Sequence, residues 1–232
     1  MRVALITVGD EILSGDIENT NATWIARKLK ELGSSLIKIS VVPDDVEMIA
    51  EEIRSIEADY IIVTGGLGTT PDDVTREGVA KALNLEMRLN QEALECMKKY
   101  IEKYGLSEQI KKMATLPEGS KVICNRVGAA PGFIVQNIVV LPGVPKEMTS
   151  MFEEISELFR GEREITREVV TTAREMRITE LLEELTRTFQ DVKIGSYPKE
   201  NSVKIKITGR DEKRVQEVCN ILRERLKEYE MS

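Results

Sequence analysis

Short apolar runs alternate with longer amphipathic segments in the first third of the chain, and this alternation restricts the fold more than any other feature. The runs are RVALITV (2–8), SLIKISVV (35–42) and YIIVT (60–64). Each is too short for an ordinary helix, and the segments between them have helical spacing, which is typical of successive βαβ units. The sequence therefore predicts an α/β domain built on a mostly parallel sheet.

Capping and turn residues set the limits of the other expected elements. Thr20 and Asn21 can cap a helix that runs through Leu32, where Gly33 ends it, and the segment after Pro43 has carboxylates in its first helical turn. Further helices are expected over 74–84, as one or two segments within 89–117, and over 145–159. A hairpin is expected over 132–143, turning at Gln136 and Asn137.

A charge-dense stretch, RGEREITRE (160–168), marks the expected boundary between two domains, 1–160 and 161–232. The second domain has the pattern strand, helix, strand, strand, helix, at 165–172, 175–188, 192–196, 202–208 and 211–230, which predicts a small α+β module. From Glu162 onward, fifteen basic residues balance fifteen acidic ones, so the first domain carries the whole net charge of -7.

The chain contains no histidine, and this absence excludes several classes of catalysis. Ser/His/Asp and Cys/His nucleophiles are ruled out, as are imidazole metal ligands. What remains is chemistry by carboxylates, hydroxyls, backbone amides, lysine or arginine and a bound hard cation, a set that suits phosphate substrates. The negative net charge argues against a general nucleic-acid binder.

Cysteine usage and hydropathy indicate an intracellular protein. Cys96, Cys124 and Cys219 lie far apart without a CxxC motif, so we expect core residues and neither a disulfide framework nor a thiolate metal site. No apolar run approaches the roughly 18 residues of a membrane helix, and the amino terminus does not have the pattern of a signal peptide. We expect a cytoplasmic protein with no membrane partner.

Glycine and acidic residues follow each predicted strand of the first domain. Ligands of open parallel sheets bind beyond the carboxyl ends of the strands, so these loops should converge on one site. The residues concerned are Gly9, Asp10, Glu11, Ser14, Asp44, Asp45, Gly65, Gly66, Gly68, Pro142 and Gly143.

The stretch TGGLGTTPDDVT (64–75) has the composition of a phosphate-binding loop, because its glycines let backbone N–H groups turn toward an anion. It lacks the lysine of GxxxxGK[ST] and does not fit GxGxxG, so a tight turn is the alternative. Asp72 and Asp73 can hold a cation or cap the next helix, and Asp44 can hold a cation or be a carboxylate of the first turn of the helix after Pro43. Carboxylates beside a phosphate site repel the phosphate unless a divalent cation lies between them, which favours a phosphate-and-metal site.

Two further segments have open interpretations. Asn19, Thr20 and Asn21 can cap a helix or contact the base or ribose of a ligand. The rigid turn at 142–145 can form a ligand wall or simply end a strand, and Lys146 behind it can neutralise a phosphate or remain solvated.

Five motifs, spread in order over about residues 1–160, resemble the amino-terminal domain of the competence/damage-inducible protein CinA and, more distantly, the MoaB/MogA molybdopterin-binding fold. They are GDEILSG (9–15), NTNATWIARKL (19–29), TGGLGTTPDDVT (64–75), APGF (130–133) and LPGVPKEM (141–148). The resemblance implies a three-layer α/β fold with a mostly parallel sheet. The tail is similar to the small KH-like α+β domain of CinA but has no GxxG, so nucleic-acid binding is not expected.

The resemblance also implies roles for particular residues. The glycine loop with Thr69 and Thr70 would bind a phosphate or pyrophosphate, and Asp44 and Asp73 would act in metal binding and catalysis. We expect the other substrate contacts from Gly9, Asp10, Glu11, Ser14, Asn21, Pro142 and Gly143. The family more often has proline where this chain has Thr69 or Thr70. Full CinA proteins continue into a nicotinamide mononucleotide deamidase domain, and this chain stops before it, so we do not expect that activity.

Three functions are compatible with these expectations. The first, the activity that the resemblance to the amino-terminal domain of CinA implies, is a metal-dependent pyrophosphatase that acts on a nucleotide such as ADP-ribose, with magnesium, manganese or cobalt as the cation. The second is a pterin-phosphate protein that binds molybdopterin or transfers adenylate to it. The third is a nucleotide-binding regulator without turnover, whose small domain recruits a partner. Related folds commonly form homo-oligomers, and the resemblance implies the same here.

Overall fold

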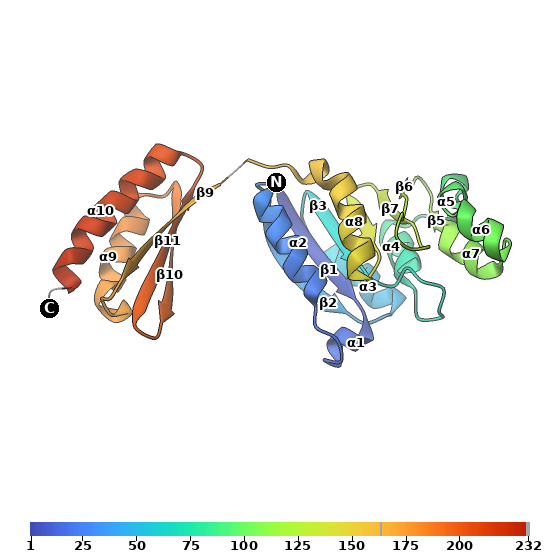
Figure 1. The fold of residues 1–232 in the computed structure, drawn as a ribbon, viewed down its shortest axis with the longest axis horizontal. Helices are drawn as coiled ribbons and strands as arrows, with labels where there is room; N and C mark the ends of the chain where they lie inside the picture. The colour runs from blue at the N-terminus through green and yellow to red at the C-terminus, as the bar shows by residue number, and fades with distance from the viewer. Residues whose placement is uncertain (163, 231–232) are drawn as a thin grey trace. The chain divides into compact units, whose positions relative to one another are not determined.

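The computed structural model describes residues 1–162 and 164–230 and divides the chain into two compact units, Met1–Gly161 and Glu162–Ser232 (Figure 1). The first unit is built on one six-stranded sheet with the order β2-β1-β3-β8-β7-β6. Its strands are β1 (Arg2–Val8), β2 (Ser35–Val42), β3 (Tyr60–Thr64), β6 (Lys121–Ile123), β7 (Gly132–Val135) and β8 (Ile138–Leu141).

Four of these strands are parallel, which confirms the predicted α/β class. Strand β1 pairs with β2 and β3, and β3 pairs with β8, all in parallel. Strands β6 and β7 continue the sheet in antiparallel fashion. The hairpin of β7 and β8 turns at Gln136 and Asn137 as predicted, and Gln136 has a φ of 51°.

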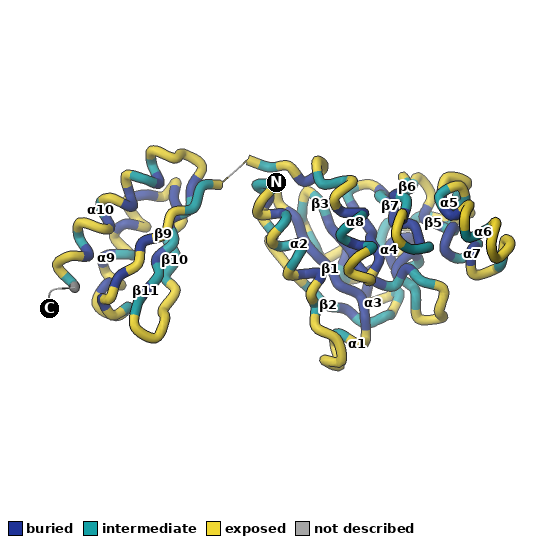
Figure 2. The backbone as a smooth tube through the Cα atoms, in the orientation of Figure 1, coloured by how far each residue is buried: buried dark blue, intermediate teal, exposed yellow. Residues whose placement is uncertain are grey.

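Helices cover both faces of the sheet and give the unit three layers. Helices α2 (Thr20–Glu31) and α8 (Pro145–Ile155) pack on one face, and α3 (Val46–Ser55) and α4 (Thr75–Leu83) belong to the core on the other. Since successive side chains of a strand point to opposite faces, Leu5 of β1 lies in one core cluster and Ile6 in the other. The central strands are accordingly buried along most of their length (Figure 2).

Helix α3 is tied to the edge strand β2 by a half-buried carboxylate. Ser40 Oγ donates to Glu52 Oε1 at 2.6 Å, and Lys38 Nζ lies 2.7 Å from the same oxygen. Burial raises the pKa of Glu52, but the hydrogen bonds from Lys38 and Ser40 outweigh it, so the pKa lies below its ordinary value.

The segment between α4 and β6 is more broken than the sequence predicts. It contains three helices where one or two were expected: α5 (Gln91–Cys96), α6 (Lys98–Tyr104) and α7 (Glu108–Ala114). The short antiparallel pair β4 (Met87–Leu89) and β5 (Thr115–Pro117) flanks them. These strands and β6 have three residues each, too few to produce an alternating pattern, and the four-residue helix α1 (Asp10–Leu13) is likewise too short to be predicted.

The predicted helix over 145–159 changes winding near its end. Helix α8 ends at Ile155, and a 3-10 turn, η1 (Ser156–Phe159), follows it. Phe159 is fully buried and stacks on Phe152 with the ring centroids 5.2 Å apart.

The expectation that no cysteine is disulfide-bonded is wrong. Cys96, at the end of α5, forms a disulfide with Cys124, just after β6, and their Cα atoms are 5.3 Å apart, a normal separation. The two residues are 28 positions apart in the sequence, so only the folded chain shows that they meet. Cys219 is a free, buried core residue, as expected.

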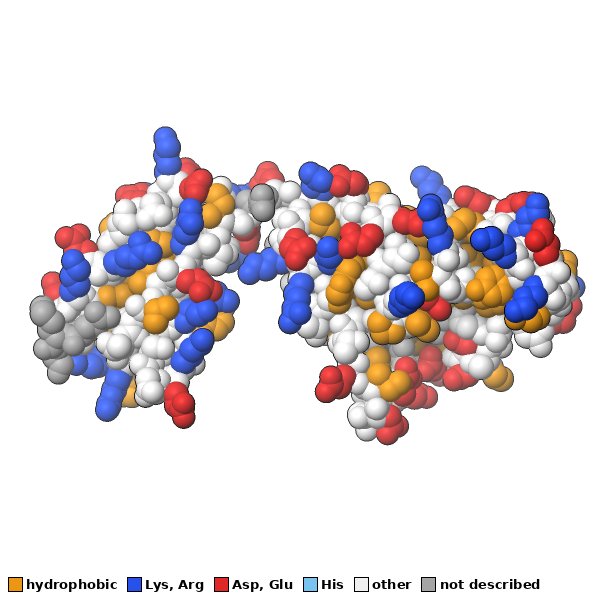
Figure 3. Space-filling model, viewed as in Figure 1, with side chains coloured by type: hydrophobic (Ala, Val, Ile, Leu, Met, Phe, Trp, Pro, Cys, Tyr) orange, Lys and Arg blue, Asp and Glu red, His pale blue; other side chains and the backbone are white. Residues whose placement is uncertain are grey.

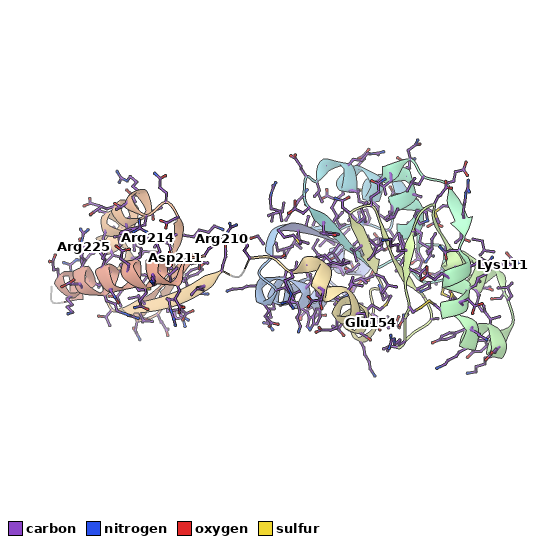
Figure 4. The ribbon with its side chains drawn as sticks, turned by 90° about the horizontal axis from the view of Figure 1, so that it is seen from above. Lys111, Glu154, Arg210, Asp211, Arg214 and Arg225 are labelled. Carbon is purple, nitrogen blue, oxygen red and sulfur yellow. A yellow bond between two sulfur atoms is a disulfide. The ribbon has the colours of Figure 1, made fainter. Side chains whose placement is uncertain are left out.

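The second unit is the predicted small α+β module. Its elements are β9 (Ile165–Thr171), α9 (Glu175–Thr188), β10 (Val192–Lys199), β11 (Ser202–Gly209) and α10 (Glu212–Glu230). The antiparallel sheet has the order β10-β11-β9, and its core contains residues of both helices. Figure 4 labels Arg225 of α10, whose Nη1 donates to Glu184 of α9 at 2.7 Å. Within the described residues, no helix is both long and apolar enough to cross a membrane.

Candidate functional site

The loops after β1, β2, β3 and β8 surround one cavity of about 670 Å³ at the carboxyl edge of the parallel strands. This volume is within the range of small-molecule sites. The predicted site residues that line the cavity are Gly9, Glu11, Asn21, Asp44, Gly65, Gly66, Gly68, Thr69, Asp73, Pro142 and Gly143. The predicted convergence of the four loops is therefore confirmed, while the chemical roles of their residues stay predictions.

Three predicted site residues do not line the cavity. Asp10 is exposed and contributes its backbone N–H, which donates to Asp44 Oδ2 at 3.1 Å. Ser14 is exposed at the end of α1, where its hydroxyl donates to Asp16 at 2.7 Å. The hydroxyl of Thr70 donates to Asp73.

Two glycines of the GGLG loop are required by close approaches of the main chain. Gly65 has a φ of +103°, and a Cβ there would lie 2.2 Å from the carbonyl oxygen of Val8. Gly66 has a φ of +61°, and its Cβ would lie 2.2 Å from Thr75 Oγ1. Since an L side chain rarely adopts either conformation, both positions require glycine, and the loop forms a tight turn.

The carboxylate of Asp73 binds two backbone N–H groups of the GGLG loop and its following turn. Its Oδ1 accepts from the backbone N–H of Gly68 at 2.7 Å, and its Oδ2 accepts from that of Thr70 at 2.8 Å. The helix-capping interpretation is wrong, because the residue at the cap of α4 is Val74, without a side-chain hydrogen bond. The carboxylate of Asp73 instead fixes the loop, and the residue lines the cavity.

Some loop amides remain available to a ligand. Within the described part of the chain, the N–H groups of Gly66, Leu67 and Thr69 have no hydrogen-bond partner. Gly66 and Thr69 are partly or fully exposed and line the cavity. An anion in the cavity would meet N–H groups there.

Arg76, which sequence reasoning missed, supports the loop from below. It is fully buried at the start of α4, and it donates from Nη1 to the carbonyl of Leu67 at 2.7 Å and from Nη2 to that of Gly68 at 3.0 Å. Burial lowers the pKa of Arg76, against the opposing charges of Glu77 and Asp73. The only sequence signal is an arginine just after the DDVT motif, which in isolation suggests a solvated helix position.

Asp44 lies beside Gly66 of the glycine loop and has other acidic side chains near it. Burial raises the pKa of Asp44, the N–H of Asp10 opposes this, and the charges of Asp10, Glu11 and Asp72 raise the pKa further. Acidic side chains gather at the end of the unit where α1 lies (Figure 3). Excess negative charge at a partly buried oxygen donor favours a hard cation.

Fewer protein ligands are available than a fully protein-held cation needs. Among the described residues, no group of three or more His, Cys, Asp or Glu side chains is arranged to hold a metal ion. Asp44 and Asp73 both line the cavity beside the glycine loop: a Cβ on Gly66 would lie 3.4 Å from Asp44 Oδ1, and one on Gly68 would lie 2.5 Å from Asp73 Oδ2. A cation there would need oxygen ligands from a bound phosphate or water, as magnesium commonly has.

The part of the cavity next to the start of α2, called its floor below, is lined by the polar residues Thr7, Asn19, Asn21 and Thr64. Asn19 caps this helix by accepting from the N–H of Ala22 at 3.1 Å, and its Nδ2 donates to Thr7 Oγ1 at 3.1 Å. Asn19, and not Thr20 or Asn21, is therefore the cap. Asn21 Nδ2 donates to the carbonyl of Gly143 at 2.7 Å, which joins α2 to the loop after β8.

The wall of the cavity includes a loop that the sequence did not single out. Asn125 accepts from the N–H groups of Val127 and Gly128, at 3.0 and 2.7 Å, and donates to Glu147 Oε2 at 2.6 Å. This loop brings Ala129 and Ala130 to the cavity. Lys146, which could have neutralised a phosphate, is exposed and does not line the cavity, whereas its neighbour Glu147 does.

The layered sheet and the cavity at its carboxyl edge define the first unit as an α/β domain of the MogA/MoaB-like fold. The position of the cavity agrees with the general rule for ligand sites of open α/β sheets. The chain belongs to the family described as the probable molybdopterin binding domain, whose model matches residues 4–160. Residues 163–232 match the model described as FAD synthase, middle domain.

Individual relatives agree with this family. The chain is 46% identical over 228 residues to a protein of Archaeoglobus fulgidus, an alignment that covers 97% of this chain and 98% of that one. It is 47% identical over 169 residues to a CinA-like protein of Thermotoga neapolitana, covering 68% of this chain but 41% of the relative. The solved structure of CinA from Thermoplasma acidophilum, described as of unknown function, superposes with a TM-score of 0.64 at 38% identity, over 68% of this chain and 99% of that one. The resemblance to CinA is confirmed.

Proposed function

We propose that this protein is a metal-dependent pyrophosphatase that cleaves a nucleotide of the ADP-ribose type. The observation that carries the proposal is the meeting of a glycine loop with open N–H groups and a partly buried acidic cluster in one cavity. The loop suits phosphate oxygens, and the acidic cluster suits the cation that a pyrophosphate brings with it. ADP-ribose is chosen as the substrate because the motifs that resemble the amino-terminal domain of CinA imply it.

In the proposed reaction, one water molecule is added across the P–O–P bridge, and ADP-ribose gives AMP and ribose 5-phosphate. The amides of Gly66 and Thr69 orient the phosphate oxygens, and Asp73 and Arg76 keep the loop in that shape from its two sides. Asp44 and Asp73 would hold the divalent cation, which supplies neutralisation of phosphate charge when bound. None of these roles needs a histidine, in keeping with the composition.

A second function, molybdopterin binding or adenylyl transfer to it, is favoured by the family model over residues 4–160. A pterin phosphate carries the same anionic group, and the same loop would bind it. The two proposals differ in turnover of ADP-ribose, so one assay separates them.

The decisive assay is release of AMP from ADP-ribose with magnesium, manganese or cobalt, for the native protein and Asp44→Asn. Asparagine keeps an oxygen that can accept from the N–H of Asp10 but removes the charge, so we expect turnover to fall by more than about a hundredfold. Asp45→Asn is the matched control. Asp45 caps α3 by accepting from Met48 N at 2.9 Å, and asparagine caps equally well.

If the native protein released AMP from ADP-ribose in the absence of any divalent cation, the metal requirement would be refuted. No AMP release from the native protein with any of the three cations would refute the pyrophosphatase proposal for this substrate. Binding of molybdopterin would then be measured.

A further inference from the structure

Two buried polar atoms at the floor of the cavity have no partner in the described part of the protein. They are Thr64 Oγ1 and Asn21 Oδ1, in side chains that are 0% and 7% exposed. Both residues line the cavity. A buried polar atom without a hydrogen bond is costly and uncommon in native proteins. Because both atoms are buried while their residues line the cavity, a bound molecule can supply the missing bonds once the Thr64 or Asn21 side chain rotates toward it.

The residues that carry these atoms are neighbours in one corner of the cavity. Thr64 ends β3 and is paired in register with Thr7 of β1, so both threonines point to the face of the sheet that α2 covers. Asn21 is in the first turn of α2 and uses its Nδ2 on the carbonyl of Gly143. A Cβ on Gly143 would lie 3.3 Å from the Cα of Gly65, the residue directly after Thr64.

The chemistry of the corner restricts what can bind. An amide oxygen only accepts hydrogen bonds, whereas a threonine hydroxyl can donate or accept. A phosphate oxygen would therefore meet the oxygen of Asn21 unfavourably. Among the described residues, neither lysine nor arginine lines this cavity, so nothing in the corner selects an anion.

We propose that Thr64 and Asn21 form a subsite for a neutral hydrogen-bond donor of the ligand, either a sugar hydroxyl or a ring or exocyclic N–H. The proposal deepens the proposed function and rests on it, because it divides the nucleotide between two parts of the cavity. The glycine loop takes the phosphates, and the Thr64–Asn21 corner takes the uncharged sugar or base.

Thr64→Val provides a clean test, with Thr7→Val as its matched control. Valine has the shape of threonine without the hydroxyl. The hydroxyl of Thr64 has no hydrogen-bond partner among the described residues, so Thr64→Val should leave the melting temperature unchanged or raise it. Thr7→Val removes the hydrogen bond that Asn19 Nδ2 donates to Thr7 Oγ1, so it should lower the melting temperature. In calorimetric titrations with ADP and magnesium, Thr64→Val should bind about five- to tenfold more weakly than the native protein, the effect of one hydrogen bond.

The source of the donor is identified with ADP analogues. The probes are 2′-deoxy-ADP, 3′-deoxy-ADP and purine riboside 5′-diphosphate, which lacks the exocyclic amino group. The analogue that lacks the group bound by Thr64 should bind the native protein and Thr64→Val with the same affinity, because the two losses remove one shared interaction.

Two results overturn the proposal, and they differ from each other. Equal affinity of native protein and Thr64→Val for ADP refutes the subsite while the pyrophosphatase proposal stands. If the native protein neither binds ADP nor hydrolyses ADP-ribose, the proposed function is refuted, and a nucleotide occupant of the corner is refuted with it.

Discussion

Replacement of Arg76 tests whether a buried guanidinium holds the GGLG loop in shape. Arg76→Met keeps much of the apolar volume but removes both donors, which leaves the carbonyls of Leu67 and Gly68 without their bonds. Hydrogen bonds from a charged donor contribute about 1.5–3 kcal/mol each, so two amount to about 3–6 kcal/mol. Methionine avoids the desolvation cost of a buried guanidinium, which offsets part of the lost hydrogen-bond energy. We therefore expect the free energy of unfolding to fall by about 3 kcal/mol.

The unfolding of this unit can be followed separately. Trp24 is the single tryptophan of the chain and packs edge-on against Phe152, at a centroid separation of 5.3 Å, so its fluorescence in urea reports on the first unit. Arg76→Lys retains the charge but has only one compact donor group, and we expect an intermediate loss. ADP-ribose turnover should be highest in the native protein, lower in Arg76→Lys and lowest in Arg76→Met.

The reasoning would be refuted by an Arg76→Met protein as stable as the native one. Such a result would mean that relief of the buried charge fully offsets the two lost bonds. Normal turnover in a destabilised Arg76→Met protein would refute only the link between this residue and the shape of the loop.

Three further predictions concern other parts of the first unit. Cys96→Ser removes the crosslink to Cys124, and for a separation of 28 residues the loop-closure relation predicts a loss of about 3–4 kcal/mol in unfolding free energy, which should vanish when both proteins are compared in dithiothreitol. Gly65→Ala forces a side chain against a main-chain oxygen of β1 at a φ of +103°, and it should lower the free energy of unfolding by about 2 kcal/mol or more in urea titrations; an unchanged midpoint would contradict the geometry. The pKa of Glu52 is lowered in the folded state, so its stabilising effect is present above the ordinary value of 4.5 and is lost as the pH falls through the folded-state pKa; the native protein should lose more stability than Glu52→Gln over that range, and parallel curves would contradict this.

The positions of the candidate site residues could be predicted where they follow from sequence-local features. Glycines and carboxylates directly after apolar strands can be read from the chain, and parallel pairing then brings those strand ends to one edge. This is why Asp44, Gly66 and Gly143 were predicted to meet and do line one cavity. Ser14 follows the same strand as Gly9 but lies beyond the short helix α1, which carries it away from the cavity.

Prediction failed where a residue's partner is distant in sequence or where two local interpretations compete. The helix cap expected of Asp73 was wrong, because its hydrogen bonds run back to the loop that precedes it; its part in metal binding stays a prediction. Cys96 and Cys124 have no local signature of pairing, and only the folded chain brings the end of α5 and the residue after β6 together.

By itself, the sequence determined the class of fold, the two-part organisation and the loops that line the cavity. Strand and helix periods, capping residues and glycine turns act over a few neighbouring positions, so they can be read directly. Only the tertiary structure decided that Arg76 supports a loop. It also decided that the hydroxyl of Thr64 has no hydrogen-bond partner among the described residues, while that of Thr7, its neighbour in the sheet, has one. Burial and hydrogen-bond satisfaction depend on what the rest of the chain places around a side chain, and no local pattern contains that information.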